Sequence, residues 1–205
     1  VMLLLSHLGH PFRAWMAIRS VRRSWISRGT VVISGFVGLG AAYVAMALVP
    51  GIEMAGWWDG PFRLVLILTG LFILLYPGFA MAASSGIPFW NSGLLPVLSM
   101  VNGIASGGII VLTFVVAVDT APSTTLLPGL IWFEQSVLCF IAICIFSYMD
   151  AMRSAGAAAS FSATYLMTRE VVLFWGMAIV IGLAVPIAIV ALVASFAMAP
   201  LSLLW

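Results

Sequence analysis

Charged side chains are scarce in this 205-residue chain, at 7% of all residues, and lysine is absent altogether. A soluble domain carries roughly a quarter charged residues, so this chain has too few charges to cover a water-exposed surface. That shortage excludes a soluble enzyme, a disordered tail and a nucleic-acid binder. The sequence has instead 64% hydrophobic residues and a mean hydropathy of +1.23. These values are typical of an all-α, polytopic bundle of transmembrane helices.

Histidine and cysteine are also scarce, with two of each. His7 and His10 stand three residues apart at one expected helix end, so they cannot hold a haem between two facing helices. Cys139 and Cys144 would lie on different faces of one helix, which precludes a disulfide bond between them. The sequence also lacks a zinc-ligand cluster, a cysteine quartet and a phosphate-binding loop. We therefore expect this chain to bind no haem, iron–sulfur cluster or metal of its own.

Five apolar segments are long enough to cross a bilayer, which takes about 20 helical residues. They are residues 31–49, 64–83, 94–118, 126–149 and 171–198. Residues 1–5 resemble the end of an earlier span, and residues 199–205 the start of a later one, so we expect sequence to be missing at both ends. The expected organisation is a helix end with a basic loop (1–30), two spans of a first bundle (31–93) and three spans of a second bundle (94–205).

The arginines are unevenly divided between the two sides that alternating spans define. Seven of the eight fall on one side, within residues 6–30 and 150–170, and only Arg63 lies at the other. By the positive-inside rule, the arginine-rich side is cytoplasmic. On the opposite side, Trp57, Trp58 and Phe62 suit an interfacial aromatic belt. Within the third span, the repeat Ser99-xxx-Gly103-xxx-Gly107 is expected to permit close helix contact.

Polar and aromatic side chains gather near Arg63. Tyr43 lies near the end of the first span on this side, Trp58 and Asp59 lie in the loop that follows, and Arg63 begins the next span. Aromatic faces can stack on a quinone ring, and a tyrosine hydroxyl or an arginine can donate a hydrogen bond to its carbonyl oxygen. A carboxylate can accept the proton released on quinol oxidation. These four residues are candidates for a quinone site; the alternative is an interfacial anchor with a surface ion pair.

Glu134 is the one acidic residue inside a predicted span. It lies roughly 12 Å along the helix from the start of its span. A carboxylate at that depth is costly and is a functional candidate by default. We expect Glu134 to take part in proton transfer; the alternative is a structural glutamate that is protonated or hydrogen-bonded.

Several stretches, taken in order, resemble the NrfD/PsrC (polysulfide reductase-type) family of membrane proteins over about residues 6–119. They are His7–Trp15 (HLGHPFRAW), Ser24–Gly29 (SWISRG), Tyr76–Phe79 (YPGF), Gly86–Ser92 with Leu95–Pro96 (GIPFWNS and LP) and Asn102–Gly107 (NGIASG). The related DmsC branch commonly carries an acidic residue where this chain has Gly29. The resemblance therefore favours the NrfD/PsrC branch.

The resemblance implies an eight-helix subunit of which this chain would hold the end of helix two and helices three to seven. Such a subunit would anchor a respiratory complex in the inner (cytoplasmic) membrane of a bacterium or archaeon, with its basic loops in the cytoplasm. It would bind menaquinone or ubiquinone and exchange electrons with a ferredoxin-like 4Fe–4S subunit, and usually a molybdopterin catalytic subunit would complete the complex. The alternatives are an ion or small-solute transporter subunit, or a purely structural membrane anchor.

Overall fold

The computed structural model describes residues 21, 22, 24–48, 58–118 and 126–197. Across these residues the chain is helical and contains no strand, which confirms the predicted all-α bundle. Five stretches of helix are long and apolar enough to cross a membrane, as the sequence predicts. They are Trp25–Leu48, Asp59–Ala82, Leu94–Ala117, Leu127–Ser154 and Val172–Ser195. The predicted helix end at residues 1–5, His7 and His10 lie outside the described residues.

Two compact units make up the chain, residues 1–80 and 81–205. The first contains α2 (Trp25–Leu48) and nearly all of α3 (Asp59–Ala82). The second contains α4 (Leu94–Val118), α5 (Leu126–Ser154), α6 (Ala157–Thr168), η2 (Val172–Ala184) and α7 (Val185–Ala197). The predicted division into a first bundle (31–93) and a second bundle (94–205) stays a prediction.

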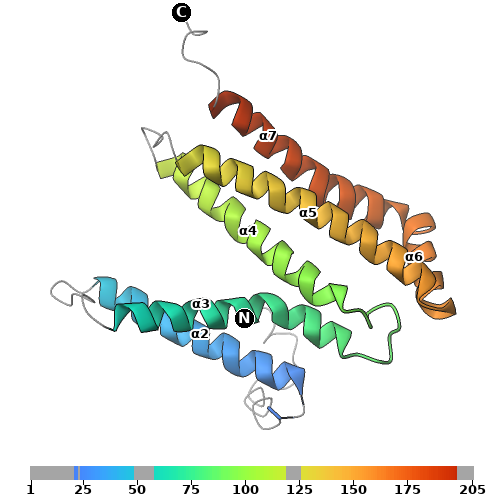
Figure 1. Cartoon of the computed structure of the whole chain (residues 1–205), viewed down its shortest axis with the longest axis horizontal. Coiled ribbons are helices and arrows are strands. Elements are labelled where there is room, and N and C mark those ends of the chain that lie inside the picture. Colours follow the sequence, from blue (N-terminus) through green and yellow to red (C-terminus); the bar gives the residue numbers. More distant parts are fainter. Residues whose placement is uncertain (1–20, 23, 49–57, 119–125, 198–205) are drawn as a thin grey trace, which may run out of the picture. The chain divides into compact units, whose positions relative to one another are not determined.

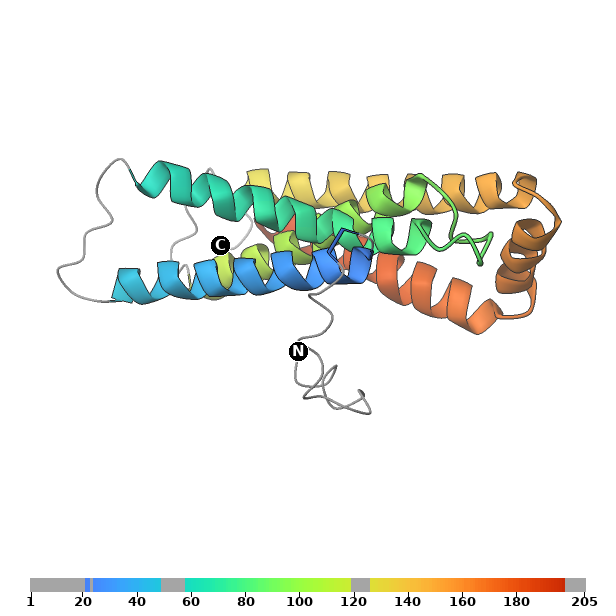
Figure 2. The same ribbon diagram turned by 90° about the horizontal axis from the view of Figure 1, so that it is seen from below.

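In the first unit, α2 and α3 pack against each other in opposite chain directions (Figures 1 and 2). At one end, the rings of Trp25 and Phe79 stack with their centroids 5.3 Å apart. At the other end, Tyr43 stacks on Phe62 at 5.6 Å. Because residue numbers rise along α2 as they fall along α3, aromatic side chains fasten both ends of this antiparallel pair.

Gly29 of α2 lies against the ring of Tyr76 on α3. A Cβ atom at this position would overlap with the ring of Tyr76. Arg28, one residue earlier, donates hydrogen bonds to the carbonyl oxygens of Val21 (3.0 Å) and Arg22 (2.8 Å). The first turns of α2 are therefore fixed both to the preceding chain and to α3.

In the second unit, α5 packs against α4, α6 and α7, and α7 in turn follows η2 (Figure 1). The shared core consists of apolar side chains from α4, α5, η2 and α7. They are Val101, Ala105, Leu112, Leu127, Ile131, Leu138, Ile141, Leu183 and Val190. Gly156, with a φ of 130°, turns the chain between α5 and α6, a conformation that glycine adopts without steric cost. The α6 helix lies across the end of the unit (Figure 2), with Ala159 and Ala163 buried.

The predicted close contact along Ser99, Gly103 and Gly107 is wrong at Gly107. That residue is exposed, and a Cβ atom added to it would meet no described atom within 4 Å. The face of α4 that turns toward α5 instead carries buried Ala105 and, one turn later, Gly108. The four-residue spacing identified a helix with small residues, but it indicated the wrong face.

The last span changes its hydrogen-bonding pattern partway along. Residues Val172–Ala184 form a π-helix, and the α-helix α7 begins at Val185. Pro186 stands in the first turn of α7, directly after the change from π-helix to α-helix. Because proline has no backbone N–H, one helical hydrogen bond is missing at this point of the span.

Candidate functional site

Arg63 and Asp59 form an ion pair at the start of α3. The Arg63 Nε donates to Asp59 Oδ1 at 2.9 Å, between residues one helical turn apart. The Arg63 side chain is 62% exposed and that of Asp59 is 28% exposed. An aspartate in the first turn also interacts favourably with the positive end of the helix dipole. A guanidinium has five N–H donors, so this pair leaves Arg63 with donors that can hold a ligand.

Tyr43 joins this pair from the neighbouring helix. Its hydroxyl interacts with the Arg63 guanidinium, and its ring stacks on that of Phe62. The stacking of Tyr43 on Phe62 thus brings Tyr43 near Arg63, the residue that pairs with Asp59. The role of these residues as a quinone site stays a prediction. Phe62 was expected only as a belt residue, and its contact with Tyr43 could not be predicted from hydropathy.

Trp58, the fourth predicted residue, lies beside this polar group on an apolar groove. The groove has a volume of about 180 Å³ and is lined by Leu39, Trp58, Pro61, Phe62 and Val65. The Trp58 side chain is 65% exposed. Phe62 contacts Tyr43 on one side and lines the groove on the other. The first unit therefore presents an aromatic groove next to a cation, a phenol and a carboxylate.

Glu134 belongs to the second unit and is only 1% exposed. Neither of its carboxyl oxygens has a hydrogen-bond partner among the described residues, and the same holds for the Oε1 atom of Gln135. The carboxyl group faces Gly108 of α4, where a Cβ atom would overlap with Glu134 Oε2. The sequence placed this acid inside a span; the structure places it at the contact between two helices.

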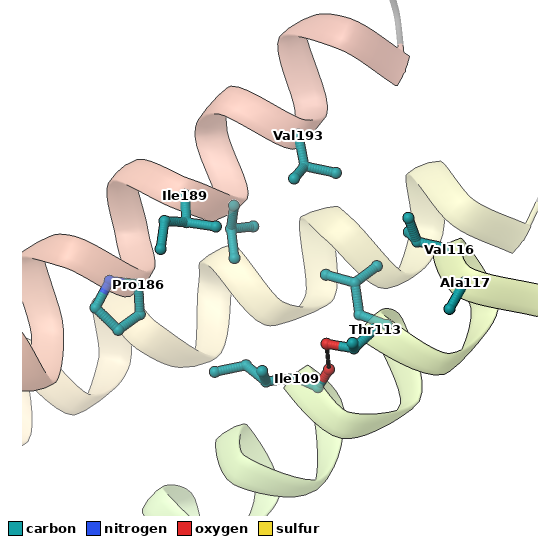
Figure 3. Close-up of a pocket in the computed structure, with 9 residues that line it drawn as sticks. Ile109, Thr113, Val116, Ala117, Pro186, Ile189 and Val193 are labelled. Atoms are coloured by element: carbon teal, nitrogen blue, oxygen red, sulfur yellow. Dashed lines mark hydrogen bonds between the residues drawn. The ribbon is translucent and has the colours of Figure 1, made fainter.

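An apolar cavity of the second unit lies between α4 and α7 and has a volume of about 390 Å³ (Figure 3). Its lining comprises Ile109, Leu112, Thr113, Val116, Ala117, Pro186, Ile189, Val190 and Val193. The only side-chain hydroxyl in this lining, that of Thr113, donates to the Ile109 carbonyl oxygen at 2.7 Å. Ligand sites combine apolar walls with a few placed polar groups, and this cavity has no charged group to orient a quinone ring. The α2–α3 site is the better candidate.

The short motifs on which the family resemblance rests contribute chiefly to the packing of helices. In SWISRG, Ser24 accepts a hydrogen bond from the Ser27 backbone N–H (3.4 Å), and Trp25 stacks on Phe79 of the YPGF motif. Tyr76 of the same motif lies over Gly29. The two motifs, almost 50 residues apart in sequence, therefore form one contact between α2 and α3.

A third motif, GIPFWNS, precedes α4. The backbone carbonyl of Phe89 accepts a hydrogen bond from the hydroxyl of Tyr148 on α5, and the two rings meet edge to face at 5.4 Å. This contact fixes the segment between α3 and α4 onto the second unit's own helices.

Metal-ligating side chains do not gather in the described part of the chain: no three His, Cys, Asp or Glu residues are grouped so as to hold an ion. Cys139 is exposed and Cys144 is buried, and both are free thiols, in agreement with the prediction that they do not pair.

Comparison with known proteins gives one match. The family model "Polysulphide reductase, NrfD" matches residues 1–199 of the chain. No curated protein and no solved structure matches the chain.

Proposed function

Because the chain belongs to the polysulphide reductase NrfD family, we propose that it is the quinone-binding membrane subunit of a respiratory oxidoreductase complex. Members of this family are membrane subunits of quinone-linked reductase complexes. The five apolar helices fit such a membrane location. One observation carries the proposal: the Tyr43 ring of α2 stacks on Phe62 of α3, next to the Arg63 that pairs with Asp59.

The residues of the α2–α3 site fit a quinone. Exposed Trp58 and the adjacent Phe62 give apolar surface for a ring. Arg63 and the Tyr43 hydroxyl can donate to a carbonyl oxygen, and Asp59 can accept a proton. A bound quinol would supply two electrons to the partner's clusters and two protons. This chain would hold the ring, keep its oxygen against Arg63 and receive one proton at an Asp59 carboxylate oxygen, while the other proton leaves to water.

Glu134 would handle protons in the second unit. Its carboxyl group is buried between α4 and α5, and none of the residues that the structure describes forms a hydrogen bond with it. An ionisable side chain inside a membrane span is a functional candidate by default.

Partner subunits would accept the electrons from the quinol that this chain binds. The chain offers no group of metal-ligating side chains among its described residues, so clusters would belong to a ferredoxin-like 4Fe–4S subunit. A molybdopterin subunit would then hold the catalytic centre of the complex. With its arginine-rich loops in the cytoplasm, the chain would sit in the inner membrane and act by positioning quinone and protons.

Inhibition of the purified complex tests this function. We expect quinol to reduce the partner's iron–sulfur clusters and an inhibitor that competes with quinone to stop that reduction. A purely structural anchor would assemble normally and show no inhibition. A transporter subunit would move an ion or solute across proteoliposomes whether or not quinol is present. Either of the last two results would overturn the proposal.

A further inference from the structure

The carboxyl group of Glu134 is buried in surroundings that offer no charge to balance it. Among the described residues of α4, η2 and α7 there is no Asp, Glu, Lys, Arg, His, Cys or Tyr at all. On α5 itself the nearest titratable side chain is Cys139, which is exposed. An ionised carboxylate with neither a cation nor a hydrogen-bond donor is costly in an apolar interior. The surroundings of Glu134 therefore favour its neutral, protonated form.

Polar side chains on α4 do not supply donors to this carboxyl group either. The Asn102 side-chain amide donates to the Leu98 carbonyl oxygen at 2.8 Å. The Ser106 hydroxyl donates to the Asn102 carbonyl oxygen at 2.9 Å. Each bonds to its own helix, on an exposed face.

Gly108 creates the space that the carboxyl group occupies. Any side chain at this position would begin with a Cβ atom that overlaps with Glu134 Oε2. At the neighbouring Gly107, a Cβ atom would meet no described atom within 4 Å. Gly108 is thus a positioning residue for Glu134, and Gly107 is its matched control.

A cavity beside the next residue on α5 provides room for water. It lies between α5 and α7, has a volume of about 380 Å³ and is lined by Ile131, Trp132, Gln135, Ala191, Ala194 and Ser195. Among the described residues the buried Oε1 atom of Gln135 has no hydrogen-bond partner. The Ser195 hydroxyl, which donates to the Leu192 carbonyl oxygen at 2.7 Å, can still accept a hydrogen bond. A cavity holds a water where it has room for about one molecule and offers two to four polar partners, so this cavity can hold water.

We propose that Glu134 is a proton-binding site of the second unit, held as the neutral acid against Gly108, and that water beside Gln135 exchanges its proton. The inference rests on the proton-transfer part of the proposed function and extends it with a position and a route. In the exchange, a carboxylate oxygen takes a proton from hydronium and leaves water; the reverse step returns the proton. The ligand is a proton, and no electron moves.

Infrared difference spectroscopy on the resting complex tests this directly, because a neutral carboxylic acid has its own carbonyl stretch. On transfer from H₂O to D₂O, we expect a carboxylic-acid band in the wild-type protein that is absent from Glu134→Gln. Gly108→Ala should shift or remove the band, and Gly107→Ala should leave it unchanged. If Glu134→Gln fails to assemble, this glycine pair assigns the band instead.

The route is tested by the rate of deuterium exchange at the same band. We expect Gln135→Leu to slow the exchange about tenfold, as a barrier higher by about 1.4 kcal/mol would do. Ser136→Ala is the matched control, since the Ser136 hydroxyl donates to the Trp132 carbonyl oxygen on an exposed part of α5. A wild-type band that is missing, or one that Glu134→Gln and Gly108→Ala both leave unchanged, would overturn the proton site. Equal exchange rates in Gln135→Leu and the wild type would overturn the water route. Neither measurement uses quinol, so loss of quinone activity in other variants would leave this result standing.

Discussion

The ring of Tyr76 on α3 lies directly over Gly29 on α2, so closely that no side chain fits at Gly29. This contact joins two motifs that are far apart in sequence and lies at the opposite end of the helix pair from Tyr43 and Arg63. Because aromatic contacts join α2 and α3 at both ends, the contact at Gly29 helps to set the position of Tyr43 at the far end.

Gly29→Ala should therefore destabilise the first unit. Overpacking of a tight contact costs typically about 1–3 kcal/mol, and we expect the thermal unfolding temperature of the purified complex to fall. Gly38→Ala on the same helix is the control, since a Cβ atom there meets no described atom within 4 Å. If both variants unfold at the wild-type temperature, the described packing of α2 on α3 is incorrect.

Tyr148→Phe should loosen the segment that precedes α4. The variant keeps the aromatic ring but removes the hydroxyl that donates to the Phe89 carbonyl oxygen. A hydrogen bond of this kind contributes about 0.5–1.5 kcal/mol. Hydrogen exchange at the amides of residues 84–93 should become faster. Tyr165→Phe serves as the comparison, because the exposed Tyr165 hydroxyl donates only to Glu170 Oε1 at 3.3 Å. Equal protection in the two variants would contradict the assignment.

Trp58→Ala should weaken quinol binding with little effect on turnover. Stacking of one aromatic ring on another contributes about 0.5–1.5 kcal/mol, which corresponds to a rise in the KM for quinol of about two- to tenfold. Trp132→Ala is the control, because Trp132 on α5 is similarly exposed but lies outside the α2–α3 site. We expect its KM for quinol to stay at the wild-type value. A change in kcat alone, or the same KM in both variants, would argue against a ring-binding role for Trp58.

Asp59→Asn should slow quinol oxidation without unfolding the protein. Its ion pair with Arg63 joins exposed side chains within one helix, and such pairs add little to stability. The asparagine keeps a hydrogen-bond acceptor but cannot take up a proton. We expect an unchanged unfolding temperature together with a lower rate of quinol oxidation. A lowered unfolding temperature would instead indicate that the pair is structural.

Hydropathy predicts the spans well but misses where helices extend into polar sequence. The third span was predicted as residues 94–118 and is Leu94–Val118. By contrast, α2 begins at Trp25 rather than residue 31, and α5 continues to Ser154 rather than ending at residue 149. These extensions contain Arg28, Asp150 and Arg153, whose charges lower the local hydropathy while the backbone remains helical. Hydropathy identifies the residues that are stable in the hydrocarbon core of a bilayer, whereas a helix can continue past the edge of that core.

The candidate sites were predictable to different degrees. Tyr43 and Arg63 could be grouped from the sequence because successive spans are antiparallel and their neighbouring ends meet. The partner of Glu134 could not be predicted, because one residue of error rotates a helix face by about 100°. The spacing favoured Gly107, whereas the adjacent Gly108 faces the carboxyl group. Only packing between helices distinguishes the two glycines.

The central claim is that Arg63 holds the quinone, and stopped-flow reduction of the partner's iron–sulfur clusters by quinol tests it most directly. In the assembled Arg63→Ala complex, we predict a rate at least about tenfold below the wild type, as expected when a charged hydrogen-bond donor to the ligand is lost. Arg153→Ala removes an exposed arginine at the end of α5. In that variant complex, quinol should reduce the clusters at the wild-type rate. An assembled Arg63→Ala complex whose clusters are reduced as fast as the wild type would contradict the account.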